Sequence, residues 1–113
     1  NNIIQYNTLI FTNLHLYSMK LMYMYKNYVK EKKISAITIS LLQELFALFE
    51  LFYDAYYKKQ LPTVHQFLQH KEQLAKKIDF SIDKGNGKII LQISMAMRCL
   101  HDSIGAVMGL IIQ

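Results

Sequence analysis

The stretch that most constrains the fold runs from Ser35 to Lys59, where apolar residues recur at steps of three and four. This spacing places the apolar side chains on one stripe of an α-helix of about five to seven turns. Most of the polar side chains fall outside the stripe, so the rest of the chain is expected to pack around this amphipathic helix. The stripe consists of Ile37, Leu41, Leu45, Leu48, Phe52 and Tyr56, and it is widened by Leu42, Phe49 and Tyr53.

Length and composition indicate one domain with apolar surface to spare. The chain has 113 residues, which suits a single core, so we treat residues 1–113 as one domain. Hydrophobic residues make up 52% of the chain, with 8 Tyr, 6 Phe and 6 Met. This content is high for so small a core, and some apolar surface is therefore expected to meet a second subunit or another partner.

Charge and cysteine content suggest the setting in which the protein works. Lys and Arg number 13 against 8 Asp and Glu, and the net charge of +5 favours polyanions unless it serves solubility alone. Cys99 is the only cysteine, so we expect a reducing cytoplasm and a thiol in the core. No run reaches the roughly 20 apolar residues that span a bilayer, so no transmembrane segment is expected.

Three further segments have the periodicity of helices. Residues 6–30 carry a seam of apolar residues at steps of four and three, and more apolar residues on other sides. That pattern predicts a long helix enclosed by neighbours or by another chain. Pro62 marks a boundary and suits the first turn of a helix that runs to about Lys77 with a narrow apolar stripe. A last helix is expected from about Met95 to Ile112.

Residues 78–94 carry a pattern that favours a β-hairpin. Residues 78–83 alternate between apolar and polar, and Asn86-Gly87 is the commonest two-residue hairpin turn. With this turn the apolar residues of the two strands face one another, and the polar residues do the same on the other side. The apolar pairs would be Ile82 with Leu91, Phe80 with Ile93 and Ile78 with Met95.

A competing interpretation starts the last helix near Lys88 and leaves residues 84–87 as a loop. It rests on a second pattern, a heptad seam through Ile93, Met97, Leu100, Ile104, Val107 and Ile111. The fold that we expect is mainly α, a compact helical domain with a β-hairpin at 78–94 that makes it winged-helix-like. The alternative is an all-α antiparallel four-helix bundle.

The sequence contains no arrangement typical of an active site. Cys99 and His101 are two residues apart, so on a helix their side chains point about 200° away from each other and form no nucleophile–base pair. His65 and His70 are five apart, whereas two zinc ligands on one helix face are four apart. We therefore expect a protein that is not an enzyme and holds no metal ion or cofactor.

The stretch PTVHQFLQHKEQLAKKIDFSIDKGNGKIILQIS, residues 62–94, resembles the recognition helix and wing of the MarR and SarA-like winged-helix transcription regulators. The resemblance covers about a third of the chain. It implies a homodimer formed by the first and last helices, with the helix after Pro62 in the major groove of DNA. Residues expected at base edges or phosphates are Thr63, His65, Gln66, Gln69 and His70, and those expected on the backbone or minor groove are Lys84 and Lys88.

Two functions remain open. The first is a DNA-binding regulator, favoured independently of any family by the basic residues around the expected hairpin, Lys76, Lys77, Lys84 and Lys88. The second is a helical protein–protein interaction module, such as a chaperone, an inhibitor or an assembly subunit, which binds through the apolar surface of its first and last helices. Both predict self-association. The interface residues expected on those helices are Leu14, Tyr17, Leu21, Leu100, Ile104, Val107 and Ile111.

Overall fold

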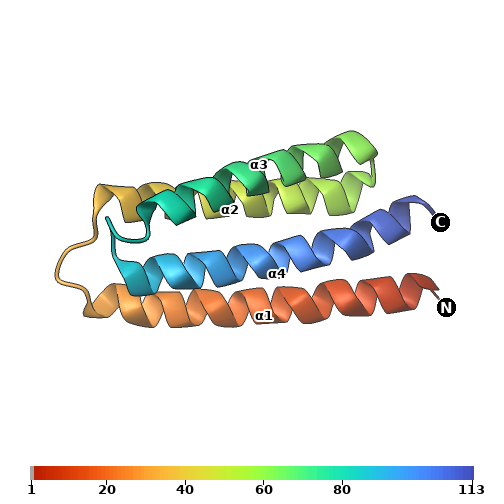
Figure 1. Cartoon of the computed structure of the whole chain (residues 1–113). Coiled ribbons are helices and arrows are strands. Elements are labelled where there is room, and N and C mark those ends of the chain that lie inside the picture. Colours follow the sequence, from red (N-terminus) through yellow and green to blue (C-terminus); the bar gives the residue numbers. More distant parts are fainter. Residues whose placement is uncertain (1) are drawn as a thin grey trace.

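Four α-helices make up the computed structural model, which describes residues 2–113 (Figure 1). They are α1 (Asn2–Lys30), α2 (Ala36–Lys58), α3 (Leu61–Ser81) and α4 (Gly87–Ile111). Each helix reverses the direction of the one before it, so the fold is an antiparallel bundle in which α1 packs on α4 and α2 packs on α3. The molecule is elongated, with extents of 49 × 24 × 17 Å.

The β-hairpin expected at residues 78–94 is wrong, because the part of the chain that the structure describes contains no strand. The α3 helix continues through Ser81, and Gly87 opens α4. A strand would send Ile89 and Ile90 to opposite faces, whereas the helix buries both against the core. The described chain is therefore all-α, the four-helix bundle that the heptad seam favoured, and not winged-helix-like.

Asn86 closes the loop between α3 and α4 onto the beginning of α2. Its side-chain Oδ1 accepts hydrogen bonds from the Ser35 backbone N–H at 2.9 Å and from the Thr38 hydroxyl at 3.0 Å. Its Nδ2 donates to the Lys33 carbonyl oxygen at 3.0 Å, and its backbone N–H donates to Thr38 Oγ1 at 2.9 Å. The Asn-Gly pair therefore joins two loops and starts a helix, where a hairpin turn had been expected.

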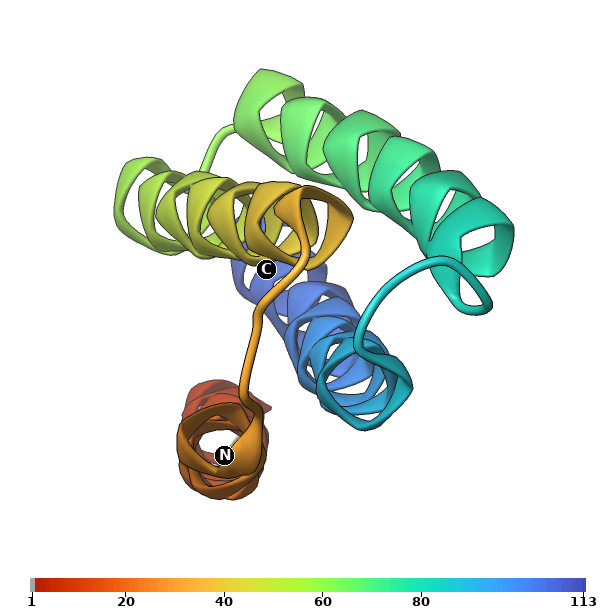
Figure 2. The same ribbon diagram turned by 90° about the vertical axis from the view of Figure 1, so that its left-hand side faces the viewer.

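The core lies where α2, α3 and α4 meet, and α1 covers only one side of it. Of its 25 residues α4 buries 11, whereas α1 buries only Ile10, Tyr17 and Met24 of its 29. Seen along the bundle, α1 lies beside α4 and apart from α2 and α3 (Figure 2). The approach to α4 is close at Gly109, where a Cβ would lie 2.6 Å from the Tyr6 ring. Much of α1 is thus left facing solvent.

Candidate protein-binding face

Large apolar side chains are exposed on neighbouring sides of α1 and α2. On each helix they recur mostly at steps of three, four or seven, so they form one stripe per helix. Each of these side chains is between 41 and 67% exposed. We call this surface the α1–α2 face, and its members are Phe11, Met22, Tyr25 and Val29 of α1 and Ile39, Phe46, Tyr53 and Tyr57 of α2.

The two helices that carry this face are held apart by side chains. No Cα atom of α1 lies within 8 Å of a Cα atom of α2. The helices are bridged by the rings of Tyr17 and Phe49, which stack with centroids 5.3 Å apart, and by the Tyr56 hydroxyl, which donates to Asn7 Oδ1 at 2.8 Å. A groove therefore runs between α1 and α2, with these side chains as its floor.

Two hollows along this groove are lined almost entirely by apolar and aromatic side chains. The larger has a volume of about 370 Å³ and includes Leu21 and Tyr28 of α1 and Leu42 of α2 in its lining. The smaller has a volume of about 200 Å³ and is lined in part by Phe11 and Tyr53. Concave apolar surface of this kind accepts the side chains of a binding partner.

The two edges of the face carry opposite charge. The α1 helix contains no Asp or Glu, and its exposed His15 and Lys26 lie along the edge of its apolar stripe. Lys26 lines a further hollow together with Met22 and Tyr25. On α2 the exposed Glu50 lies four residues after Phe46, and it forms no ion pair with any residue of the described chain. The face is thus basic along α1 and acidic along α2.

The interface residues expected from the sequence lie mainly inside the bundle. Tyr17, Leu100, Ile104 and Val107 are buried, and Leu14, Leu21 and Ile111 are half-buried against the core. Tyr17 stacks on Phe49 of α2, and Leu14 and Leu21 line the hollows between α1 and α2. On α4 the only large hydrophobic side chains that are well exposed are Leu91 and Met95.

The contribution of α2 to the exposed surface was missed from the sequence. The rest of the chain was expected to pack around its apolar stripe, but Tyr53 of that stripe is 54% exposed, and Phe46 and Tyr57, which lie outside the stripe, are also more than half exposed. The signal was the width of that stripe, since Leu42, Phe49 and Tyr53 extend it beyond what one packing neighbour covers.

The residues expected to read base edges are spread along α3. Thr63 is buried and its hydroxyl donates to the Gln60 carbonyl oxygen at 2.6 Å. His70 Nε2 lies 3.2 Å from the Glu44 carbonyl oxygen, which ties it to α2. The exposed members of the set are His65, Gln66 and Gln69.

The lysines expected to contact phosphates are exposed, but three of them have partners within the chain. Lys76 Nζ lies 3.7 Å from Glu72 Oε1, and Lys77 Nζ lies 2.6 Å from Glu44 Oε1. The Lys84 ammonium lies 3.1 Å from the centroid of the Phe80 ring. Lys76 and Lys77 lie near the C-terminal end of α3, Lys84 in the α3–α4 loop and the exposed Lys88 in the first turn of α4, whereas Lys58 and Lys59 lie where α2 ends. The α2–α3 and α3–α4 loops are at opposite ends of the bundle (Figure 1). The basic residues therefore do not form one patch.

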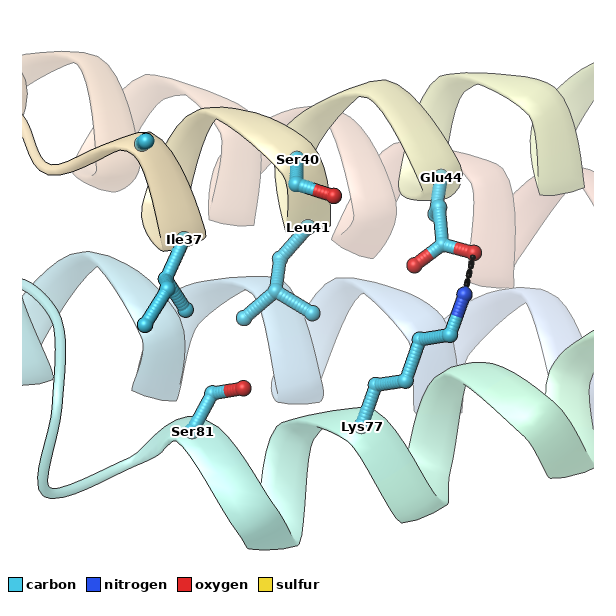
Figure 3. Close-up of a pocket in the computed structure, with 7 residues that line it drawn as sticks. Ile37, Ser40, Leu41, Glu44, Lys77 and Ser81 are labelled. Atoms are coloured by element: carbon cyan, nitrogen blue, oxygen red, sulfur yellow. Dashed lines mark hydrogen bonds and ion pairs between the residues drawn. The ribbon is translucent and has the colours of Figure 1, made fainter.

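A hollow of about 290 Å³ between α2 and α3 contains the Glu44–Lys77 ion pair (Figure 3). Ser40 and Ser81 also line it, without a histidine or a second carboxylate to act as their base. Within residues 2–113 no three His, Cys, Asp or Glu side chains come together as a metal site would require. The arrangement joins two helices and offers no catalytic geometry.

The single cysteine has the properties of a core thiol. Cys99 is half-buried, and burial together with the nearby Asp102 carboxylate raises the pKa of its thiol. A raised pKa keeps the thiol protonated and makes it a poor nucleophile. Burial, together with the positive charge of Lys71, lowers the pKa of His101, so this imidazole is neutral at physiological pH.

By length and composition alone, α2 is apolar enough to cross a membrane, contrary to the expectation from the sequence that no segment passes such a test. Only 28% of the apolar stretch of α2 is buried in the bundle, because the α2 residues of the α1–α2 face are exposed. The helix also carries three carboxylates, and Glu44 pairs with Lys77 of α3. A single helix of this kind is weak evidence for a membrane span.

Comparisons with known proteins place this chain in no family. No protein-family model, no curated protein and no solved structure matches it. The α1–α2 face therefore has to be interpreted from its own geometry and chemistry.

Proposed function

We propose that the protein is a non-enzymatic helical protein–protein interaction module that binds through the α1–α2 face. The observation that carries this proposal is the exposure of eight large apolar side chains in one stripe on each of two neighbouring helices, five of which surround the hollows between the helices. An α-helix as long as α2 is about 34 Å long, and two helices side by side are about 20 Å wide, so the face covers about 700 Å². This area is the outline of the two helices, and within it the apolar side chains form a contiguous patch of the kind that marks a binding surface.

The shape of the face favours a helical partner. Its apolar residues follow the helix axes, and the groove between α1 and α2 offers hollows into which the side chains of another helix can insert. Three of the eight exposed side chains are tyrosines, which combine a large apolar ring with a polar hydroxyl and are enriched at protein interfaces. A chaperone, an inhibitor or an assembly subunit would use such a surface.

The charged residues support DNA binding less well than the α1–α2 face supports binding to a protein. The lysines near the α3–α4 loop are engaged with Glu44, Glu72 and Phe80, and no wing projects from this end within residues 2–113. Contacts with several phosphates on one face would be needed for tight binding to duplex DNA. The net charge of +5 is therefore interpreted as a solubility feature.

Photo-crosslinking in the cells that make the protein tests this proposal. A photoreactive phenylalanine analogue at Phe46 lies in the face, and the same analogue at Phe80, 70% exposed on α3, serves as a matched control. We expect a protein adduct from position 46 and none from position 80. Adducts with lipid alone, or no protein adduct from either Phe46 or Phe11, would contradict the proposal.

A further inference from the structure

We infer that the occupant of the α1–α2 face is a second copy of this chain, and this inference rests on the proposed binding role of the face. Two copies would associate so that α1 and α2 of each form an intermolecular four-helix bundle.

The charges on the two edges are complementary to each other. The α1 edge carries His15 and Lys26 and has no carboxylate, whereas the α2 edge carries the unpaired Glu50. A partner that matched both edges would need a basic helix beside an acidic helix. A second copy of the α1–α2 face supplies this combination.

One symmetry axis brings the complementary edges together. A two-fold axis parallel to the helices places α1 of one copy over α2 of the other, so the basic edge meets the acidic edge on both sides. Because α1 and α2 are antiparallel, each helix then also has an antiparallel neighbour across the interface. A perpendicular axis would instead place α1 against α1, where no carboxylate offsets the lysines.

The register of α1 against α2 predicts which residues would pair across the interface, namely His15 of one copy with Glu50 of the other. Within a chain Tyr17 lies level with Phe49, and Asn7 lies level with Tyr56. His15 is therefore level with Glu50, and the parallel two-fold axis preserves this level between copies. The imidazole of one copy would face the carboxylate of the other.

The area of the face suits an occupant of two helices. A stable interface buries about 800 Å² on each partner, close to the roughly 700 Å² of the α1–α2 face. A single helix would cover only one of the two stripes and leave the other in water. A second copy brings two helices of matching length.

Sedimentation equilibrium of the purified full chain tests the inference, with Phe46→Glu and the control Phe80→Glu. We expect the natural chain to dimerise. Phe46→Glu should raise the dissociation constant about a hundredfold or more, because the carboxylate is buried without a partner twice in a two-fold interface. Phe80→Glu should leave it unchanged, and circular dichroism verifies that both variants fold. A natural chain that is monomeric at about 100 μM, or equal effects of both substitutions, would overturn the inference.

A charge exchange tests the symmetry independently of apolar contacts. His15→Glu places two carboxylates opposite one another in a homodimer, and Glu50→Lys removes the carboxylate and places an ammonium opposite the imidazole, so each should weaken the homodimer about tenfold. In an equimolar mixture of the two chains, both contacts between positions 15 and 50 become attractive, so a heterodimer tighter than either homodimer should form. A mixture that associates no better than its components would overturn the parallel axis.

The outcomes separate this inference from the proposed function. If the chain is monomeric but position 46 crosslinks to a different protein, the second copy is excluded and the binding role of the face stands. If the chain is monomeric and position 46 gives no protein adduct, both proposals are overturned. A dimer that Phe46→Glu dissociates supports both.

Discussion

Asn86 is the residue on which the closure of the bundle depends most. Its side chain makes three hydrogen bonds to residues 33–38, about fifty positions earlier in the chain. The neighbouring Gly85 leaves no room for a side chain, since a Cβ there would lie 2.7 Å from Thr38 Oγ1. The sequence showed an Asn-Gly pair and predicted a hairpin, because the partners that make Asn86 an inter-loop clamp are distant in sequence.

Replacing Asn86 should therefore destabilise the whole bundle. We expect Asn86→Ala to lower the free energy of unfolding by about 2–4 kcal/mol, because it leaves the part-buried Ser35 N–H and Thr38 hydroxyl, and the exposed Lys33 carbonyl, without their hydrogen-bond partner. Urea unfolding followed by circular dichroism measures the change. Asn27→Ala is the matched control, because the Asn27 side chain bonds only to the Tyr23 carbonyl oxygen of its own helix. Equal losses in the two variants would contradict the role of Asn86.

Tyr17 is a buried residue of α1 that stacks on Phe49 of α2. Burial raises the pKa of its phenol to about 12, from an ordinary value of 10.0. Because the folded state holds this proton more tightly than the unfolded state, the stabilising contribution is complete below pH 10.0 and is lost as pH rises toward about 12.

We expect the stability of the natural chain to fall more steeply with pH above 10.0 than that of Tyr17→Phe, which has no phenol to ionise. Urea midpoints measured from pH 8 to about pH 11 test this, with the difference between the two chains as the readout. Tyr57→Phe, on the exposed end of α2, is the control and should follow the natural chain. Parallel curves for the natural chain and Tyr17→Phe would argue against a buried phenol.

At the scale of elements, the sequence predicted the existence of all four helices better than their ends. The long apolar seams of residues 6–30 and 35–59 correctly predicted nearly the whole length of α1 and α2. The C-terminal end of α3 and the start of α4 were misjudged, because residues 78–83 alternate like a strand over too few positions to reveal their helical period. Burial of both Ile89 and Ile90 by α4 is more favourable than the strand that the alternating apolar and polar residues would allow.

The packing of α1 on α4 gives a paired prediction from two glycines of α4. A Cβ at Gly105 meets no atom within 4 Å, so Gly105→Ala should stabilise the protein by about 0.5–1 kcal/mol through helix propensity. A Cβ at Gly109 would lie 2.6 Å from the Tyr6 ring, so Gly109→Ala should push α1 away and lose this gain. Thermal or urea unfolding of both variants measures the difference. Equal stabilisation by both would mean that α1 is not held closely at this point.

On the scale of the whole molecule, the position of each helix in the bundle decides which apolar surface is left for a partner. The apolar excess in the composition correctly indicated surface beyond the core, and its association with a partner remains a prediction. The sequence analysis assigned this surface to the first and last helices. Exposed apolar side chains do lie on α1, but most of those on α4 are buried, which seams of the same period and similar residues could not reveal. Only the tertiary arrangement, with α4 central and α1 outside, assigns the exposed stripes to α1 and α2.

The most direct test of the account measures whether the α1–α2 face becomes covered. The chain contains no tryptophan, so Phe46→Trp introduces a single fluorescent reporter in the face and Phe80→Trp introduces one outside it. If two copies associate through the α1–α2 face, the emission of Phe46→Trp should shift to shorter wavelength and become protected from iodide quenching as the concentration of purified protein rises. The emission of Phe80→Trp should not change. If the two reporters stay equally accessible at every concentration, a second copy does not cover the face, and the central claim is contradicted.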